Sequence, residues 1–221
     1  MKKLKNLKWP VPPYAHKYLI LCFVNMMCAY YLTRVIGITP KYDFTLPVDR
    51  SIPLLPLFSY IYIFAYAYWA LSYIYISRFS EAFSKRLFTA DLIGKIVSLA
   101  CFFLLPCSLA RPEISDIHGA GAWLTKIIYI VDEPNNLLPS LHCFVSYICF
   151  RPLLSKSAPP SKPAILIISF SFSVLVCLST LFTRQHVLID LISGIALGEA
   201  AWLLSGYFLK KIDRAKQLKD S

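Results

Sequence analysis

The chain has 221 residues, of which 57% are hydrophobic and only 16% charged, and it carries a formal net charge of +11. A soluble domain of this length does not need so much apolar sequence, whereas runs of about twenty apolar residues are typical of transmembrane helices. The basic residues lie mostly in short loops and at the termini, which favours an anionic membrane face over nucleic acid as their partner.

Six apolar segments follow one another along the chain, and each is predicted to be a transmembrane helix. They cover residues 18–37, 56–76, 92–109, 139–154, 163–182 and 185–209, and the fourth is short for a tilted span. The first follows a basic N-terminus without a small-residue cleavage site, which indicates a retained helix and not a removed signal peptide. The expected fold is therefore all-α, a polytopic bundle of six transmembrane helices forming one integral membrane domain over residues 1–221.

Lysine and arginine residues are distributed unevenly between the two sides of these segments. Placing both termini in the cytoplasm puts a large majority of the 23 basic residues in cytoplasmic segments, as the positive-inside rule requires. We therefore expect cytoplasmic termini, with the protein in the plasma (inner) membrane. The longest outer segment, residues 110–138, contains the apolar stretch GAWLTKIIYI, which is too short to cross and predicts an interfacial or re-entrant helix.

Two features inside the spans are predicted to serve packing. Glu199 lies in the middle of the sixth segment, where helix pairing and a gating role are both open and pairing is favoured. The second segment is rich in tyrosine, and these side chains are expected to pack between helices and to meet lipid headgroups.

Polar residues gather in three clusters at the predicted outer face. They are ARPEI (110–114) after the third segment, LPSLH (138–142) at the start of the fourth, and RQHVLID (184–190) at the start of the sixth. The predicted topology depends on hydropathy and charge alone, so the position of all three clusters at one face is an independent indication of a single site within residues 111–194.

The histidines and the aspartate of these clusters have the chemistry of an activated base or nucleophile. His186 and Asp190 are four residues apart, so a helix would place them on one face. A carboxylate there can hold the proton of one imidazole nitrogen and leave the other free to attack or to accept a proton. His142 lies two residues after Ser140, at the start of the fourth segment, and could donate a proton to an anion bound there.

The remaining polar residues are suited to an anion. Ser140 precedes an apolar helix as an N-cap does, and its hydroxyl and the neighbouring backbone N–H groups would form an anion site. Arg111 and Arg184 supply guanidinium groups that match the geometry of phosphate. Together the three clusters predict a phosphate-handling site.

These residues resemble the type 2 phosphatidic acid phosphatase superfamily of membrane lipid phosphatases and phosphotransferases. That family's signature is Lys, six residues, Arg-Pro; then Pro-Ser-x-His; then Ser-Arg, five residues, His, three residues, Asp. The resemblance implies that His186 is the nucleophile that accepts the phosphoryl group, Asp190 its orienting carboxylate and His142 the general acid. It also implies that Ser140 and Arg111 contact phosphate, and that no metal or other cofactor is needed.

Two positions depart from the signature. The lysine of the first motif falls on Leu104, and the arginine of the third falls on Thr180, although Ser179 matches the adjoining serine. Arg184 lies closer to His186 than the family's arginine and is predicted to bind phosphate or a headgroup from another direction. Such a set resembles the divergent branch that includes inositol phosphorylceramide and sphingomyelin synthases, which pass a phospho-headgroup to an alcohol.

The expected function is thus a lipid phosphatase or phospho-headgroup transferase that acts through a phosphohistidine at the non-cytoplasmic face. Its substrate would be a phospholipid or a polyprenyl or sphingoid phosphate; the lipid, the acceptor and the oligomeric state stay open. One alternative is a transporter or channel without catalysis. Another is an intramembrane serine hydrolase that uses Ser140, although no GxSxG elbow surrounds this serine.

Overall fold

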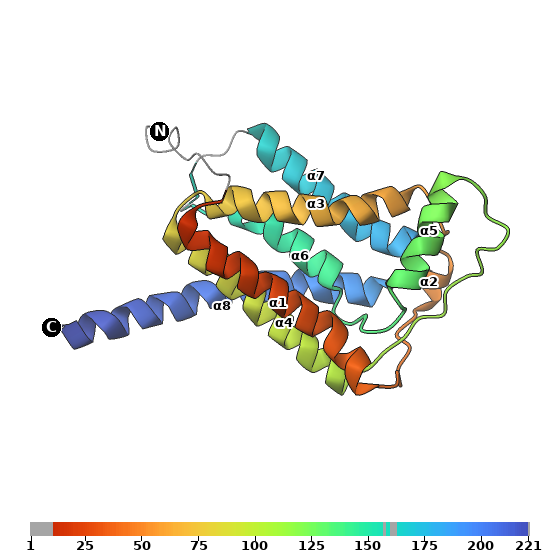
Figure 1. Cartoon of the computed structure of the whole chain (residues 1–221), viewed down its shortest axis with the longest axis horizontal. Coiled ribbons are helices and arrows are strands. Elements are labelled where there is room, and N and C mark those ends of the chain that lie inside the picture. The colour runs from red at the N-terminus through yellow and green to blue at the C-terminus, as the bar shows by residue number, and fades with distance from the viewer. Residues whose placement is uncertain (1–10, 157, 160–162, 221) are drawn as a thin grey trace.

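The computed structural model describes residues 11–156, 158–159 and 163–220, and these residues form a bundle of helices with no strand among them (Figure 1). The helices are α1 (Pro13–Ile36), α2 (Pro47–Arg50), α3 (Phe58–Ser77), α4 (Glu81–Leu104), α5 (Ala120–Val131), α6 (Leu141–Phe150) with the 3-10 turn η2 (Arg151–Leu154), α7 (Pro163–Phe182) and α8 (Leu188–Asp220). Five lysines of the predicted cytoplasmic segments lie outside the described residues: Lys2, Lys3, Lys5, Lys8 and Lys162.

Three of these helices, α4, α7 and α8, are long and apolar enough to cross a membrane, which indicates a membrane protein. α1 and α3 have comparable lengths of 24 and 20 residues, and α3 contains six tyrosines. α6 has ten residues and spans about 15 Å at 1.5 Å per residue, half of the roughly 30 Å hydrocarbon core. With the 3-10 turn that follows it, α6 forms an apolar helical segment over Leu141–Leu154, which is shorter than these three helices.

The ends of some helices agree with the ends of the predicted segments, and those of others do not. α7 has the bounds of the fifth predicted segment. α4 begins at Glu81, well before residue 92, because the Ser80 hydroxyl accepts a hydrogen bond from the Phe83 N–H at 3.1 Å and caps the helix. The stretch GAWLTKIIYI forms α5, as predicted.

α6 is the central helix of the bundle, packed against α3, α4, α7 and α8. Eight of its ten residues are buried. α4 approaches it closely at Gly94, where a Cβ atom would lie 2.0 Å from the Phe144 ring. The surrounding helices therefore fix the position of α6, and with it the position of its N-terminus.

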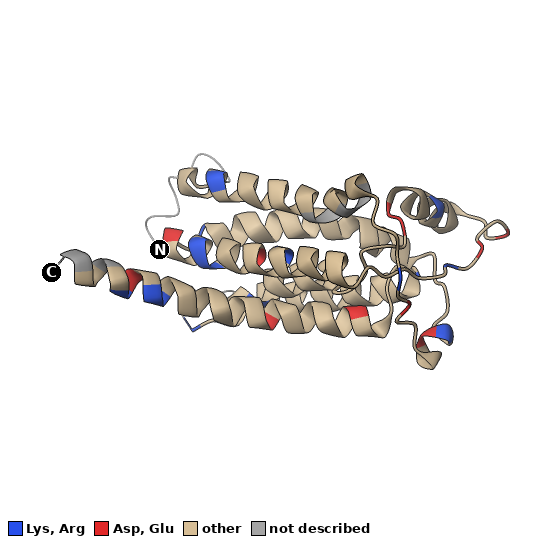
Figure 2. Cartoon of the chain, turned by 90° about the horizontal axis from the view of Figure 1, so that it is seen from below, with Lys and Arg blue, Asp and Glu red and all other residues tan. Residues whose placement is uncertain are grey.

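One end of the bundle carries α2, α5 and the starts of α6 and α8, and it is called the α5 end below (Figure 1). The long helices are largely free of charge along their length, with charged residues collecting near their ends and in the loops (Figure 2). Glu199 is an exception whose predicted pairing is confirmed, since Arg151 donates to its two carboxylate oxygens at 2.5 and 2.9 Å.

Candidate active site

The second and third polar clusters bring their histidines together at the α5 end. The ring centroids of His142 and His186 are 6.0 Å apart, and each residue is only 8% exposed. Both line a small cavity of about 40 Å³, which has room for a few water-sized atoms. The proximity of these two imidazoles, more than forty residues apart in the sequence, is the central geometric fact of the site.

His186 is oriented by Asp190, although not by the helical face that the spacing suggested. α8 begins at Leu188, so His186 lies in the turn before it. Asp190 Oδ2 accepts the Val187 N–H at 3.0 Å and lies 3.3 Å from Nδ1 of His186. The predicted contact is present because Asp190 caps the start of the helix, and it leaves Nε2 of His186 as the nitrogen available to a ligand.

α8 touches the N-terminus of α6 directly. The Ser140 N–H donates to the Asp190 carbonyl at 3.0 Å. Where α8 passes this point it carries Gly194, and a Cβ there would lie 2.5 Å from the Ser140 carbonyl oxygen. A glycine is therefore needed for α8 to bring His186 and Asp190 against the second cluster.

His142 is enclosed by aromatic side chains from α3. The Tyr62 ring stacks on it with centroids 4.3 Å apart, and Trp69 and Tyr66 lie at 5.2 and 5.9 Å. The Tyr62 hydroxyl is 3.5 Å from Nδ1 of His142 and donates a short hydrogen bond to Asp132. Nε2 of His142 is buried and has no hydrogen-bond partner among the described residues. A ligand in the cavity can therefore supply that partner.

Ser140 is the N-cap of α6, as its sequence position predicts. Its hydroxyl accepts the Cys143 N–H at 3.4 Å, and the side chain is fully buried. Ser140 does not line the histidine cavity. The structure thus places this serine behind the site, with its hydroxyl already engaged in capping.

Arg111 does not line the histidine cavity, and its hydrogen bonds connect the segments that surround this cavity. Its guanidinium donates to the carbonyls of Tyr129 and Asp132 at 3.2 and 2.5 Å, forms a short hydrogen bond to the Gln185 side chain, and lies 4.5 Å from the Tyr129 ring centroid. Burial raises the pKa of Tyr129, which stays protonated and donates to the Thr183 carbonyl at 3.0 Å. Arg111 therefore connects the end of α5 to the residue that precedes His186.

Arg184 points away from the two histidines. It has a positive φ of 55°, and its guanidinium donates to the carbonyls of Asp49, in a short hydrogen bond, and of Ile52, at 3.3 Å. The buried Asp49 carboxylate in turn accepts the Leu188 N–H at 2.9 Å. Arg184 and Asp49 together attach the α2 segment to the start of α8, and neither lines the histidine cavity.

The two positions that depart from the family signature, Leu104 and Thr180, place no cationic side chain in the site. Leu104 is 75% exposed at the end of α4. Thr180 is fully buried; its hydroxyl donates to the Cys177 carbonyl at 2.7 Å, and its own carbonyl accepts the N–H groups of Gln185 and His186 at 2.9 and 3.1 Å. Position 180 thus still contacts the site, through its backbone.

Three residues of the site were not singled out from the sequence. Asp132, at the end of α5, and Gln185 both line the histidine cavity, and Tyr62 connects Asp132 to His142. Gln185 lies inside the RQHVLID cluster and so was within reach of sequence reasoning. Asp132 and Tyr62 approach His142 only through the packing of α3 and α5, for which no local signal exists.

The described residues contain no group of three or more histidine, cysteine, aspartate or glutamate side chains arranged to hold a metal ion. Comparison of the chain with protein-family models, with curated proteins and with solved structures gave no match. The chemistry of the site therefore has to be inferred from its own geometry.

Proposed function

We propose that this protein is a membrane enzyme that transfers a phosphoryl group or a phospho-headgroup from a lipid through a phosphohistidine intermediate. The observation that carries this proposal is the pair of buried imidazoles lining one cavity, one of them held by a carboxylate. On this proposal the chain belongs with the type 2 phosphatidic acid phosphatase superfamily, has six membrane-embedded segments with cytoplasmic termini, and places the site at the non-cytoplasmic face.

In the first step, His186 attacks phosphorus. Asp190 holds the Nδ1 proton, so that the Nε2 lone pair forms the new N–P bond while the P–O bond to the lipid alcohol breaks. The departing alkoxide takes a proton from Nε2 of protonated His142. The Asp132 carboxylate, acting through the Tyr62 hydroxyl, stabilises the positively charged His142 ring before that transfer.

In the second step, an acceptor hydroxyl attacks the phosphorus on His186 from the same cavity. Neutral His142 now accepts the proton of that hydroxyl, and the N–P bond breaks to regenerate His186. If the acceptor is water the product is a free phosphate or phospho-headgroup, and if it is an alcohol the product is a new phospholipid. Both outcomes use the same residues.

The charges around the cavity favour a phosphodiester donor. Asp132 and Glu133 both line the cavity, and no lysine or arginine is among its lining residues in the described part of the chain. A phosphomonoester near neutral pH approaches two negative charges, whereas a phosphodiester carries one, and like charges repel strongly in a partly buried site. We therefore favour transfer of a phospho-headgroup over hydrolysis of a phosphomonoester.

Trapping of the intermediate tests the proposal. Purified protein is incubated with phospholipids labelled with ³²P, both mono- and diesters, and is then quenched in alkali, which preserves phosphohistidine. We expect label that survives alkali, is lost in acid and maps to His186. His118, an exposed loop histidine, provides the matched control: His186→Gln should abolish labelling and His118→Gln should not. Label on any other residue, or equal labelling of the two variants, would refute the proposal.

The alternatives make different predictions for this experiment. A transporter or channel would give no covalent label with any lipid. A serine hydrolase would place an alkali-labile ester on Ser140, but this hydroxyl caps α6 and has no histidine among its hydrogen-bond partners in the described part of the chain. The geometry therefore favours the histidine pair over the serine.

A further inference from the structure

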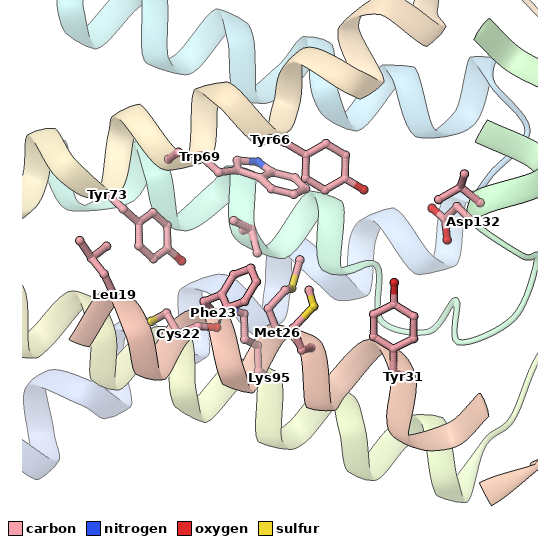
Figure 3. A pocket seen from close by; sticks show the side chains of 14 residues that line it. Leu19, Cys22, Phe23, Met26, Tyr31, Tyr66, Trp69, Tyr73, Lys95 and Asp132 are labelled. Atoms are coloured by element: carbon pink, nitrogen blue, oxygen red, sulfur yellow. Dashed lines mark hydrogen bonds between the residues drawn. The ribbon is translucent and has the colours of Figure 1, made fainter. Parts of the chain in front are cut away.

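A second and larger cavity, of about 420 Å³, lies between α1, α3, α4 and α6 (Figure 3). This volume is within the range of about 300–1,000 Å³ that ligand pockets occupy. Its walls are apolar, with Leu19, Phe23 and Met26 contributed by α1 and Trp69 by α3. Walls that are mostly apolar suit a hydrocarbon chain better than a polar metabolite.

The larger cavity adjoins the histidine cavity. Met26, Tyr66 and Asp132 line both of them. A molecule with its phosphate between the two histidines can therefore extend an attached chain past these three residues into the larger cavity.

The distance from His142 to the far part of the cavity matches one leaflet of a bilayer. On α3, Tyr62 stacks on His142 outside the larger cavity, and the aromatic side chains that line it follow as far as Tyr73. These two tyrosines are separated by eleven residues, which is about 16 Å along a helix. This is close to half of the roughly 30 Å hydrocarbon core, so a chain anchored at the histidines would end near the middle of the membrane.

A polar cluster closes the far end. Lys95 pairs with Asp91 at 2.8 Å and donates to the Cys22 carbonyl of α1 at 3.3 Å, and the Tyr73 hydroxyl donates to Asp91 at 2.6 Å. Lys95 and Tyr73 both line the cavity. Pushing an apolar chain through this cluster would separate a buried ion pair, which is costly. The cluster is therefore suited to be the floor of the cavity.

The side of the cavity is open between α1 and α3. Phe23 and Tyr31 of α1 and Tyr66 of α3 line it and are nevertheless 65%, 48% and 49% exposed. Such an opening lets a lipid chain enter sideways from the bilayer, without passing through water.

We propose that this cavity binds one hydrocarbon chain of the lipid substrate, and that the floor formed by Tyr73, Asp91 and Lys95 limits the chain to about the depth of one leaflet. This rests on the proposed function for the identity of the headgroup. The chain-binding part is measured independently of turnover below.

Photo-crosslinking locates the chain. Full-length protein in nanodiscs is exposed to two phosphatidylcholine probes that carry a diazirine near the headgroup or near the end of one chain. The first probe should label peptides containing Met26, Tyr31 or Tyr66, and the second should label those containing Cys22, Tyr73 or Lys95. Labelling that does not depend on the position of the diazirine, or that falls only on α7, would overturn the proposal.

A substitution that fills the cavity tests its use. Ala70 lines the cavity from α3, whereas Ala67 is an exposed residue of the same helix that does not line it. Ala70→Trp should suppress end-of-chain labelling, and each displaced methylene should weaken binding by about fourfold. Ala67→Trp, the matched control, should leave labelling unchanged. Equal labelling of the two variants would overturn the proposal.

The floor is tested by chain length. In the paired variant Asp91→Ala/Lys95→Ala, probes with chains several carbons longer should bind as well as the optimal chain binds to the unaltered protein. An unchanged length optimum in a folded paired variant would overturn the role of the floor. Chain labelling without any phosphohistidine would refute the proposed function and leave the cavity proposal intact, whereas phosphohistidine without chain labelling would do the opposite.

Discussion

Replacement of Gly194 by alanine tests whether the close approach of α8 to α6 creates the site. The added Cβ would lie 2.5 Å from the Ser140 carbonyl oxygen, 3.0 Å from the Cys143 Cβ and 3.3 Å from the Phe144 nitrogen. Two of these neighbours are backbone atoms at the start of a central helix, so they cannot move aside as a flexible side chain can. α8 itself must shift, and it carries Asp190 with it.

The expected cost is larger for activity than for stability. Overpacking of a tight contact costs about 1–3 kcal/mol, and alanine recovers up to about 1 kcal/mol of helix propensity over glycine. The net loss of stability should therefore be at most about 2 kcal/mol. A displacement of reacting groups by about 1 Å can lower a rate a hundredfold, so kcat should fall by about two orders of magnitude.

Gly206→Ala is the matched control on the same helix. A Cβ at this position would meet the Arg86 guanidinium at 2.9 Å, and this is the far end of a flexible side chain that can move. Both variants are compared by thermal unfolding in detergent and by single-turnover labelling of His186. Gly194→Ala with full labelling, or with the same loss as Gly206→Ala, would refute the view that this contact positions the histidine.

Four further substitutions separate the roles assigned within the site. Asp190→Asn should lower the labelling rate by roughly a thousandfold or more, because the orienting carboxylate is lost; rapid-quench labelling measures this. Tyr62→Phe should slow it by about tenfold, since one hydrogen bond near His142 disappears, and an unchanged rate would remove Tyr62 from the mechanism. Arg184→Ala should cost about 1–3 kcal/mol of stability by removing the guanidinium hydrogen bonds to the Asp49 and Ile52 carbonyls, and thermal unfolding should show this while labelling falls far less than in Asp190→Asn. Asp132→Asn should raise the rate with phosphomonoesters relative to phosphodiesters by about fivefold, as one repelling charge is removed; a ratio that stays constant would contradict the charge argument.

The sequence predicted the helical architecture because apolar runs and turn residues act locally. The α5 helix and the bounds of α7 follow from such patterns. The limits of α4 and α6 do not, since hydropathy reports where a chain is apolar and not where its capping groups lie. Ser80 extends α4 at its start, and the fourth apolar segment divides into α6 and a 3-10 turn.

The same distinction applies to the site. The contact between His186 and Asp190 is local and their spacing predicts it, although His186 lies in the turn before α8 and the two residues do not share a helical face. The partners of Arg111 and Arg184 are backbone carbonyls of remote segments, which carry no residue-specific signal. A guanidinium that suits phosphate suits a carbonyl equally well, so arginine placement could not be predicted from residue type alone.

On the proposed function, the use of both arginines for hydrogen bonds within the protein bears on which lipid can react. With Leu104 exposed and Thr180 buried as a neutral side chain, neither signature position adds a cation, while Asp132 and Glu133 add negative charge to the cavity. A dianionic phosphate would enter with little compensation for its desolvation. A phosphodiester needs less, and its binding free energy can come from the hydrocarbon chain instead, at a site remote from phosphorus. The apolar cavity between α1 and α3 can therefore supply binding free energy that cationic side chains do not supply here. We expect the affinity for a lipid to depend more on its hydrocarbon chain than on the charge of its headgroup.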